Sequence, residues 1–175
     1  HRVSLPPAIP NIARHLSLMA AAQPARTALK IPRGRTRGGD IDYLALTFAE
    51  LDAEVGAWCA RLTAAGVGRG DRTLVMVRQG LPLIASAFAL FRLGAVPVIA
   101  DPGMGLKSFL ACVARSRPRA LVGIPFAQLV SRICRGSFRS IGVRVSASSS
   151  LTARLTVPGS PLSTLNPPLA DSAAA

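Results

Sequence analysis

The residues of this sequence that could do acid–base chemistry are few and far apart. His1 and His15 are the only histidines, and neither stands in a motif that supplies the partners of a catalytic triad or a metal site. Asp101 lies in the turn of GAVPVIADPGMG (94–105) and could act as a general base, but no second acid, His or Lys stands beside it. We therefore favour the interpretation that Asp101 orders the Pro102-Gly103 turn through side-chain-to-backbone hydrogen bonds.

The cysteines give no further candidate. Cys59, Cys112 and Cys134 form an odd set without a C-x-x-C pair. This usage predicts reduced, buried thiols in a cytoplasmic protein, and it disfavours a disulfide framework or a zinc site. From the residues alone we assign no catalytic, cofactor-binding or metal-binding residue.

The formal net charge is +13, and all but two of the 21 basic residues are arginine. Such a balance could serve nucleic acid or an anionic membrane. The arginines are, however, spaced singly along the chain, and Tyr43 is the one aromatic residue near a basic cluster. We interpret RGRTRGG (33–39) as an exposed hairpin tip, and we expect no nucleic-acid partner. A basic nucleic-acid binder remains an alternative, and its affinity for nucleic acid would fall steeply as the salt concentration rises.

The elements that would position a site begin with a short helix, capped by Asn11 and ended by Pro24. Strands are expected over Thr27–Ile31 and Ile41–Leu46, as the two arms of a hairpin. In LTFAELDAEVGAWCARLTAAGVGRGD (46–71), Thr47 and Glu50 have the spacing of a capping box. This helix should bury Phe48, Leu51, Val55, Cys59 and Leu62 with Trp58 at the flank, and Gly66 should end it.

Strands and helices then alternate. We expect strands over Thr73–Val77, Ala95–Ala100, Ala120–Ile124 and Ser140–Ser146, and helices over Leu81–Gly94, Leu106–Arg115 (with Leu106, Phe109, Leu110 and Val113 inward) and Phe126–Cys134. This order predicts the α/β class: a mostly parallel sheet with helices on both faces. Pro97 restricts its strand to an edge or a bulge. Prolines, a glycine and Arg92 interrupt the apolar run 81–100, so we expect no membrane span.

The predicted domain organisation has three parts. Residues 1–26 form an N-terminal lead with the short helix, residues 27–145 form the α/β domain, and residues 146–175 form a disordered or aberrant tail rich in Ser, Pro and Ala. The first residue is His, so we expect a fragment or a processed product.

Three segments carry a resemblance to adenylate-forming enzymes. LTFAELD (46–52) resembles their first core motif, GVGRGDRTLVMVRQG (66–80) resembles the passage into the following strand, and FRLGAVPVIADPGMG (91–105) resembles the second core motif. DPGMG and the later GIP (123–125) are similar to a subgroup of fatty-acid–CoA ligases that includes the β-lactone synthetases of bacterial olefin biosynthesis. The resemblance covers roughly residues 11–145.

The resemblance implies a parent enzyme that uses ATP and Mg²⁺ to convert a carboxylate into an acyl adenylate. In the olefin subgroup the acid is a 2-alkyl-3-hydroxy fatty acid, which closes to a β-lactone. Family members also need a Ser/Thr/Gly-rich phosphate loop ending in Pro-Lys, an aromatic-Thr-Glu segment, a ribose-binding Asp and a C-terminal catalytic Lys. This sequence contains none of these, and SSSLTARLTVPGS (148–160) lacks the lysine.

This difference implies an incomplete first subdomain of the adenylate-forming fold, which binds no cofactor alone and accepts a fatty acyl substrate only within an intact parent. Its expected partner is the missing remainder of the synthetase. The alternative is a non-catalytic interaction module that pairs with a separately encoded remainder.

Overall fold

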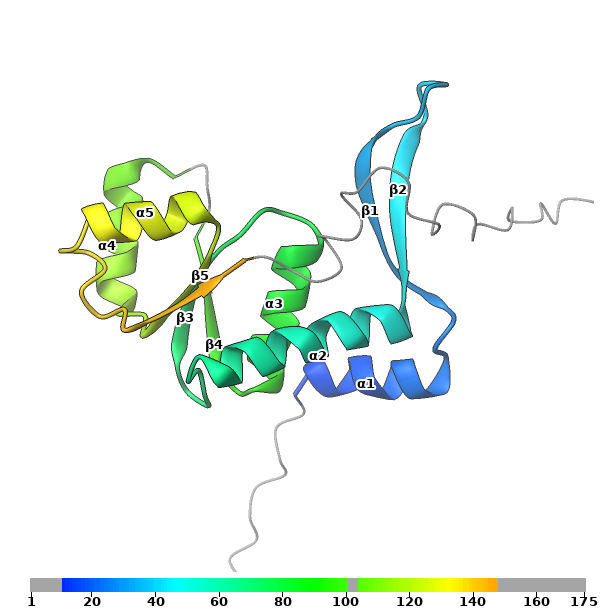
Figure 1. The fold of residues 1–175 in the computed structure, drawn as a ribbon, viewed down its shortest axis with the longest axis horizontal. Coiled ribbons are helices and arrows are strands. Elements are labelled where there is room, and N and C mark those ends of the chain that lie inside the picture. The colour runs from blue at the N-terminus through cyan, green and yellow to red at the C-terminus, as the bar shows by residue number, and fades with distance from the viewer. Residues whose placement is uncertain (1–10, 101–103, 148–175) are drawn as a thin grey trace, which may run out of the picture.

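The computed structural model describes residues 11–100 and 104–147. The chain forms a helical layer, a two-stranded hairpin and a four-stranded sheet with two further helices beyond it (Figure 1). The hairpin projects from one end of the molecule, and the last two helices lie at the other end (Figure 1).

The N-terminal elements match the predicted order. Helix α1 (Ala13–Ala22) is followed by strands β1 (Thr27–Arg35) and β2 (Ile41–Thr47), which pair antiparallel. The side-chain oxygen of Asn11 accepts a hydrogen bond from the Ala13 N–H at 3.0 Å, so Asn11 supports the helix start from one residue before the N-cap position. The hairpin is confirmed, and its strands are longer than predicted.

Helix α2 (Phe48–Ala64) begins at the predicted capping box. The Thr47 hydroxyl accepts from the Glu50 N–H at 3.2 Å, and the Glu50 carboxylate accepts from the Thr47 N–H at 2.8 Å. The N–H groups of Phe48 and Ala49, the first two residues of α2, donate to the carbonyls of Arg26 and Pro24 in the loop between α1 and β1. At the other end Gly66 has φ +84°, the left-handed conformation expected after a helix.

The main sheet has the strand order β4-β3-β5-β6, and every neighbouring pair is parallel. Its strands are β3 (Arg72–Met76), β4 (Val96–Ile99), β5 (Ala120–Gly123) and β6 (Val143–Ser146). The mostly parallel α/β fold is therefore confirmed. Strand β4 lies at the edge, where Pro97 removes no ladder hydrogen bond from the sheet interior.

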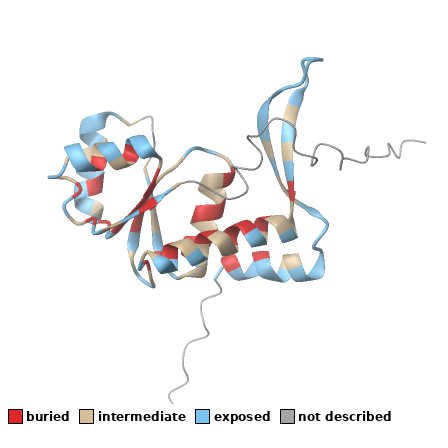
Figure 2. Ribbon diagram, in the orientation of Figure 1, coloured by how far each residue is buried: buried red, intermediate tan, exposed pale blue. Residues whose placement is uncertain are grey.

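Helices cover both faces of this sheet. Val75 and Val122 pack into one core with α1, α2 and α3 (Leu81–Arg92), whereas their neighbours Leu74 and Leu121 pack into a second core with α4 (Leu106–Ser116) and α5 (Pro125–Ile133). Neighbouring residues of a strand point to opposite faces, so one short apolar strand supplies both cores. Buried residues accordingly concentrate along α2, α3 and the central strands (Figure 2).

Three predictions about burial are wrong. Trp58, which is predicted to flank the buried face of its helix, is fully buried in the core that α2 shares with α1 and α3. Leu106, which was placed inward, is 64% exposed. Cys112 is exposed, whereas Cys59 and Cys134 are half-buried; all three thiols are free. In α2 the buried residues Leu51, Val55, Trp58 and Leu62 follow helical spacing, so Trp58 lies within the apolar stripe. Leu106 is the first residue of α4, where the stripe has not yet met the core.

Removing the Thr47 hydroxyl should weaken the fold without any change in architecture. We expect Thr47→Ala to lower the free energy of unfolding by about 1 kcal/mol, because the Glu50 N–H loses its acceptor. Thr47→Ser is the matched control, since it keeps the hydroxyl, and its free energy of unfolding should stay close to that of the parent. Urea denaturation followed by circular dichroism measures both, and equal midpoints for the Ala and Ser variants would contradict the capping box.

Candidate functional site

The first and second family-like motifs are joined by an ion pair. Asp52, at the end of LTFAELD, contacts Arg92 of the α3 terminus with 2.6 Å between Oδ1 and Nη2. The Ser17 hydroxyl of α1 donates to the same Asp52 oxygen at 3.0 Å and accepts from Arg92 at 3.0 Å. This triad links three helices, so the two motifs have a structural role where they meet.

The GVGRGD turn connects the helical layer to the sheet. The Asp71 carboxylate accepts from the Gly68 N–H at 2.8 Å and forms an ion pair with Arg119, which also donates to the Gly66 carbonyl at 2.8 Å. The Gly70 N–H donates to the Gly94 carbonyl at 2.9 Å, which holds this turn beside the second motif. These polar groups bond to one another and to backbone, and the partner of the Asp71 carboxylate is a guanidinium, which cannot act as a general base.

The carboxyl edge of the parallel sheet is the place where α/β proteins bind ligands. Asp101 follows β4 at this edge, and it lies outside the described residues, as do Pro102 and Gly103. Of the described residues that directly follow the strands (77–80, 100, 104–105, 124–125 and 147), only Arg78 is ionisable. This described part of the edge therefore offers neither a general base nor a carboxylate for Mg²⁺.

Helix α2 carries two half-buried ionisable groups, Cys59 and Arg61. The Arg61 guanidinium stacks over the Trp58 ring at 3.9 Å from its centroid. Burial lowers the pKa of Arg61, and the nearby Glu54 carboxylate partly opposes that change. Burial likewise raises the pKa of the Cys59 thiol, against a smaller lowering by Arg92. We assign these shifts to packing, because each follows chiefly from desolvation.

Residues able to hold a metal do not gather in the described ranges 11–100 and 104–147. No group of three or more His, Cys, Asp or Glu side chains occurs there. The Ser148–Ser160 segment, which was compared with a phosphate loop, lies outside those ranges. In the same ranges, no helix is long and apolar enough to cross a membrane.

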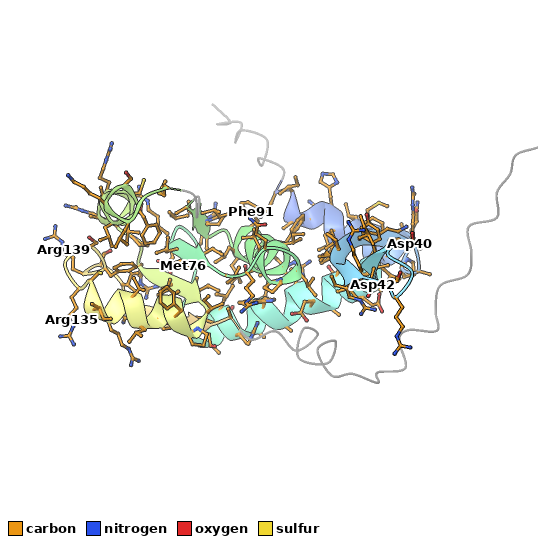
Figure 3. All side chains as sticks on the ribbon, turned by 90° about the horizontal axis from the view of Figure 1, so that it is seen from above. Asp40, Asp42, Met76, Phe91, Arg135 and Arg139 are labelled. Carbon is orange, nitrogen blue, oxygen red and sulfur yellow. The ribbon has the colours of Figure 1, made fainter. Side chains whose placement is uncertain are left out.

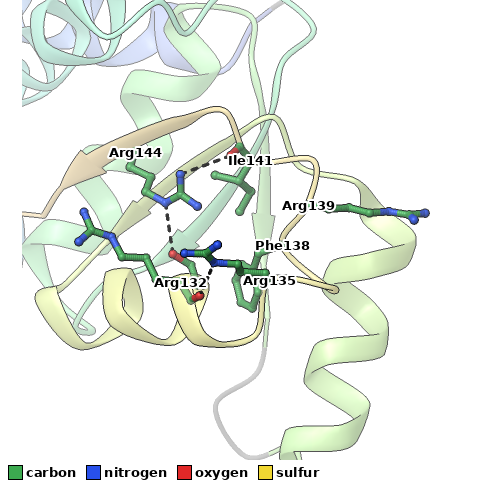
Figure 4. A pocket seen from close by; sticks show the side chains of 7 residues that line it. Arg132, Arg135, Phe138, Arg139, Ile141 and Arg144 are labelled. Carbon is green, nitrogen blue, oxygen red and sulfur yellow. Dashed lines mark hydrogen bonds between the residues drawn. The ribbon is translucent and has the colours of Figure 1, made fainter.

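One constellation was missed from the sequence. A hollow of about 610 Å³ lies between the end of α5, the following loop and the start of β6. Four arginines line it around Phe138 and Ile141: Arg132, Arg135, Arg139 and Arg144 (Figure 4). The arginines are indeed single in sequence, but the fold brings these four together. The sequence carries one signal for this arginine cluster, because residues 102–170 contain basic residues and no acidic residue.

Comparison with known proteins gives a consistent picture. The AMP-binding enzyme model matches residues 17–160. The chain is 42% identical over 126 residues to an olefin beta-lactone synthetase of Xanthomonas campestris, which covers 71% of this chain and 23% of that protein. It is 33% identical over 99 residues to a medium/long-chain-fatty-acid–[acyl-carrier-protein] ligase of Mycobacterium tuberculosis, which covers 57% of this chain and 18% of that protein. The chain thus spans less than a quarter of these relatives' length.

Solved structures share the fold at low identity. The N-terminal domain of FACL13 from Mycobacterium tuberculosis superposes with a TM-score of 0.65 at 20% identity, over 84% of this chain and 36% of that chain. A fatty acyl CoA synthetase from Mycobacterium tuberculosis superposes with a TM-score of 0.63 at 19% identity, over 83% of this chain and 28% of that chain. The motif order, the parallel sheet and the match over residues 17–160 agree: the chain belongs to the AMP-binding enzyme family.

Proposed function

We propose that this chain is the N-terminal part of an acyl-adenylate-forming ligase whose acid is a 2-alkyl-3-hydroxy fatty acid. The observation that carries the proposal is the 42% identity over 126 residues to the olefin beta-lactone synthetase of Xanthomonas campestris. A second olefin beta-lactone synthetase, from Stenotrophomonas maltophilia, is 39% identical over 127 residues. The fatty-acid ligases match over shorter stretches, which makes simple fatty acids the second choice of substrate.

The reaction would proceed in two steps. A carboxylate oxygen of the acid attacks the α-phosphorus of ATP, and pyrophosphate leaves. The 3-hydroxyl oxygen of the same molecule then attacks the acyl carbon, AMP leaves with the bonding electron pair, the hydroxyl proton goes to a base, and a β-lactone remains. A general base and a phosphate-binding group are both needed for this chemistry.

The described residues at the carboxyl edge of the sheet do not fit ATP or Mg²⁺. Those that directly follow the strands offer Arg78 as their one ionisable side chain, and the sequence has no Pro-Lys phosphate loop. We therefore assign these residues a positioning role. The Asp52–Arg92 pair fixes α2 against α3, and the Asp71–Arg119 pair fixes the turn before β3 against β5. The groups that hold nucleotide would come from the remainder of the synthetase.

Exposed apolar side chains support a protein partner of this kind. Val96 and Ile99 of the edge strand β4 are 47% and 56% exposed, and Phe126, Leu129 and Ile133 present an apolar stripe on α5. An unpaired strand edge beside apolar surface favours association. The same surfaces would serve the alternative, a non-catalytic module bound to a separately encoded remainder. A cytoplasmic location stays a prediction from the cysteine usage.

An assay of the isolated 175-residue polypeptide tests the positioning role. We expect no acid-dependent exchange of labelled pyrophosphate into ATP above the no-protein blank, with either a fatty acid or a 2-alkyl-3-hydroxy fatty acid. The Xanthomonas campestris relative, assayed in parallel, controls for substrates and metal. Exchange by the isolated polypeptide that depends on added acid would show that these residues hold a complete nucleotide site, and it would overturn the proposal.

A further inference from the structure

The arginine hollow beside α5 has a charge arrangement that the positioning role does not explain. Within residues 11–100 and 104–147, none of its four arginines lies within ion-pairing distance of a carboxylate. Arg33, Arg92 and Arg119, in contrast, each pair with an aspartate. Seen from above, Arg135 and Arg139 lie at one end of the molecule, and Asp40 and Asp42 of the hairpin lie at the other (Figure 3). The local positive potential is therefore not neutralised by neighbours.

Two of the guanidinium groups converge. Arg135 and Arg144 turn toward one another over the hollow, whereas Arg132 and Arg139 extend outward on its two sides (Figure 4). Arg144 is held by donation from Nε to the Ser131 hydroxyl at 3.3 Å and from Nη1 to the Ile141 carbonyl at 3.4 Å. Arg135 is held by donation from Nε to the Arg132 carbonyl at 3.2 Å. Each guanidinium has five N–H donors, so most of them remain available to a ligand.

The floor of the hollow selects the class of ligand. Phe138 and Ile141 are 2% and 6% exposed, so they close the bottom with apolar surface. An apolar wall strengthens the attraction between a guanidinium and an anion, because it lowers the local dielectric constant. A buried ring cannot stack on a nucleobase, which is how single-stranded nucleic acid is usually held. Guanidinium forks match phosphate oxygens in two-point contact.

We propose that this hollow is a binding site for a phosphate group, with Arg135 and Arg144 as the primary contacts. Arg132 and Arg139 stand at its rim, where rotation of their exposed side chains brings them to a second phosphate of a di- or triphosphate. A hollow of about 610 Å³ accommodates a small phosphorylated molecule. The phosphate can belong to a free anion or to a lipid headgroup. The inference is independent of acyl-adenylate formation.

Calorimetric titration of the full 175-residue chain with sodium pyrophosphate tests the site. We expect saturable binding that becomes at least about tenfold weaker in Arg135→Gln/Arg144→Gln, since two-point guanidinium contacts are lost. The affinity of Arg135→Lys/Arg144→Lys for pyrophosphate should lie between those of the parent and the double Gln variant, because an ammonium group keeps the charge and lacks the planar fork. Arg14→Gln/Arg37→Gln removes the same charge from α1 and the hairpin tip, and it should bind as the parent does. Thermal melting establishes that each variant is folded.

Sedimentation with phosphatidylglycerol vesicles, against phosphatidylcholine vesicles, distinguishes the two sources of phosphate. If pyrophosphate binds and vesicles do not, the ligand is a free phosphate anion. If vesicles bind, and this binding is lost in Arg135→Gln/Arg144→Gln but kept in Arg14→Gln/Arg37→Gln, the ligand is a lipid headgroup. The proposal is overturned if neither probe binds, if both double Gln variants lose binding equally, or if a single-stranded oligonucleotide binds and both phosphate probes fail.

Discussion

Replacing Trp58 by alanine is expected to lower the free energy of unfolding by about 3–5 kcal/mol, which is the usual cost of deleting a large buried aromatic side chain. Trp58 is fully buried in the core that α1, α2 and α3 form against one face of the sheet. It also carries the Arg61 guanidinium on its ring, so the substitution leaves a half-buried charge without its stacking partner. A single domain is stable by roughly 5–15 kcal/mol, so this change removes a large share of the total.

Thermal unfolding followed by circular dichroism measures this effect. We expect the melting temperature of Trp58→Ala to fall by roughly 10 °C or more. Trp58→Phe should recover part of the loss, since it keeps a ring in the same space. Phe126→Ala is the matched control for a large aromatic deletion, because Phe126 is 68% exposed. A melting temperature for Trp58→Ala that equals that of Phe126→Ala would contradict the central position of Trp58.

Gly123→Ala should destabilise the chain through one close contact. A Cβ atom at this position of β5 would lie 2.9 Å from the Cβ of Ala127 on α5, well inside van der Waals distance. Both residues are buried, and overpacking of a tight core costs about 1–3 kcal/mol. Gly142→Ala is the control, since a Cβ atom there would meet no atom within 4 Å.

A double-mutant cycle separates this contact from other effects of the substitution. Ala127→Gly alone should cost about 1 kcal/mol, because glycine is a poor helix former. In the combined variant Gly123→Ala/Ala127→Gly, the total loss should be smaller than the two single losses added together, since the new methyl group occupies the space that is vacated. Strict additivity in urea denaturation would show that β5 and α5 are not packed as described.

Much of this fold could be predicted because the deciding signals are local. The Thr47–Glu50 spacing fixes the start of α2, and Gly66 fixes its end, through backbone geometry within a few residues. Pro97 indicated an edge strand or a bulge because proline lacks an N–H donor, and β4 lies at the edge. The alternation of short apolar strands with helices of suitable length then leaves few arrangements other than a parallel sheet.

What could not be predicted depends on distant parts of the chain. The Asp52–Arg92 pair joins residues that are far apart in sequence, and only the packing of α2 against α3 brings them together. The arginine hollow combines the end of α5, a loop and β6, so arginines that look scattered in sequence become neighbours in space. Asp101, the one acid singled out at the start, lies outside the described residues, and its turn-ordering role stays a prediction.

We propose that these residues serve as the N-terminal part of a β-lactone-forming synthetase. The most direct test exchanges the matching 126-residue segment of the Xanthomonas campestris synthetase for the corresponding segment of this chain. A chimera that takes its segment from the Stenotrophomonas maltophilia synthetase controls for the junctions. The measurement is pyrophosphate release and β-lactone formation from a 2-alkyl-3-hydroxy fatty acid and ATP.

We predict that the chimera with this chain releases pyrophosphate and forms β-lactone in equal amounts, as the control chimera does. A chimera that folds, while the control is active, and yet releases no pyrophosphate with any fatty acid would contradict the claim. Activity on simple fatty acids alone would retain the ligase assignment and contradict the β-lactone substrate.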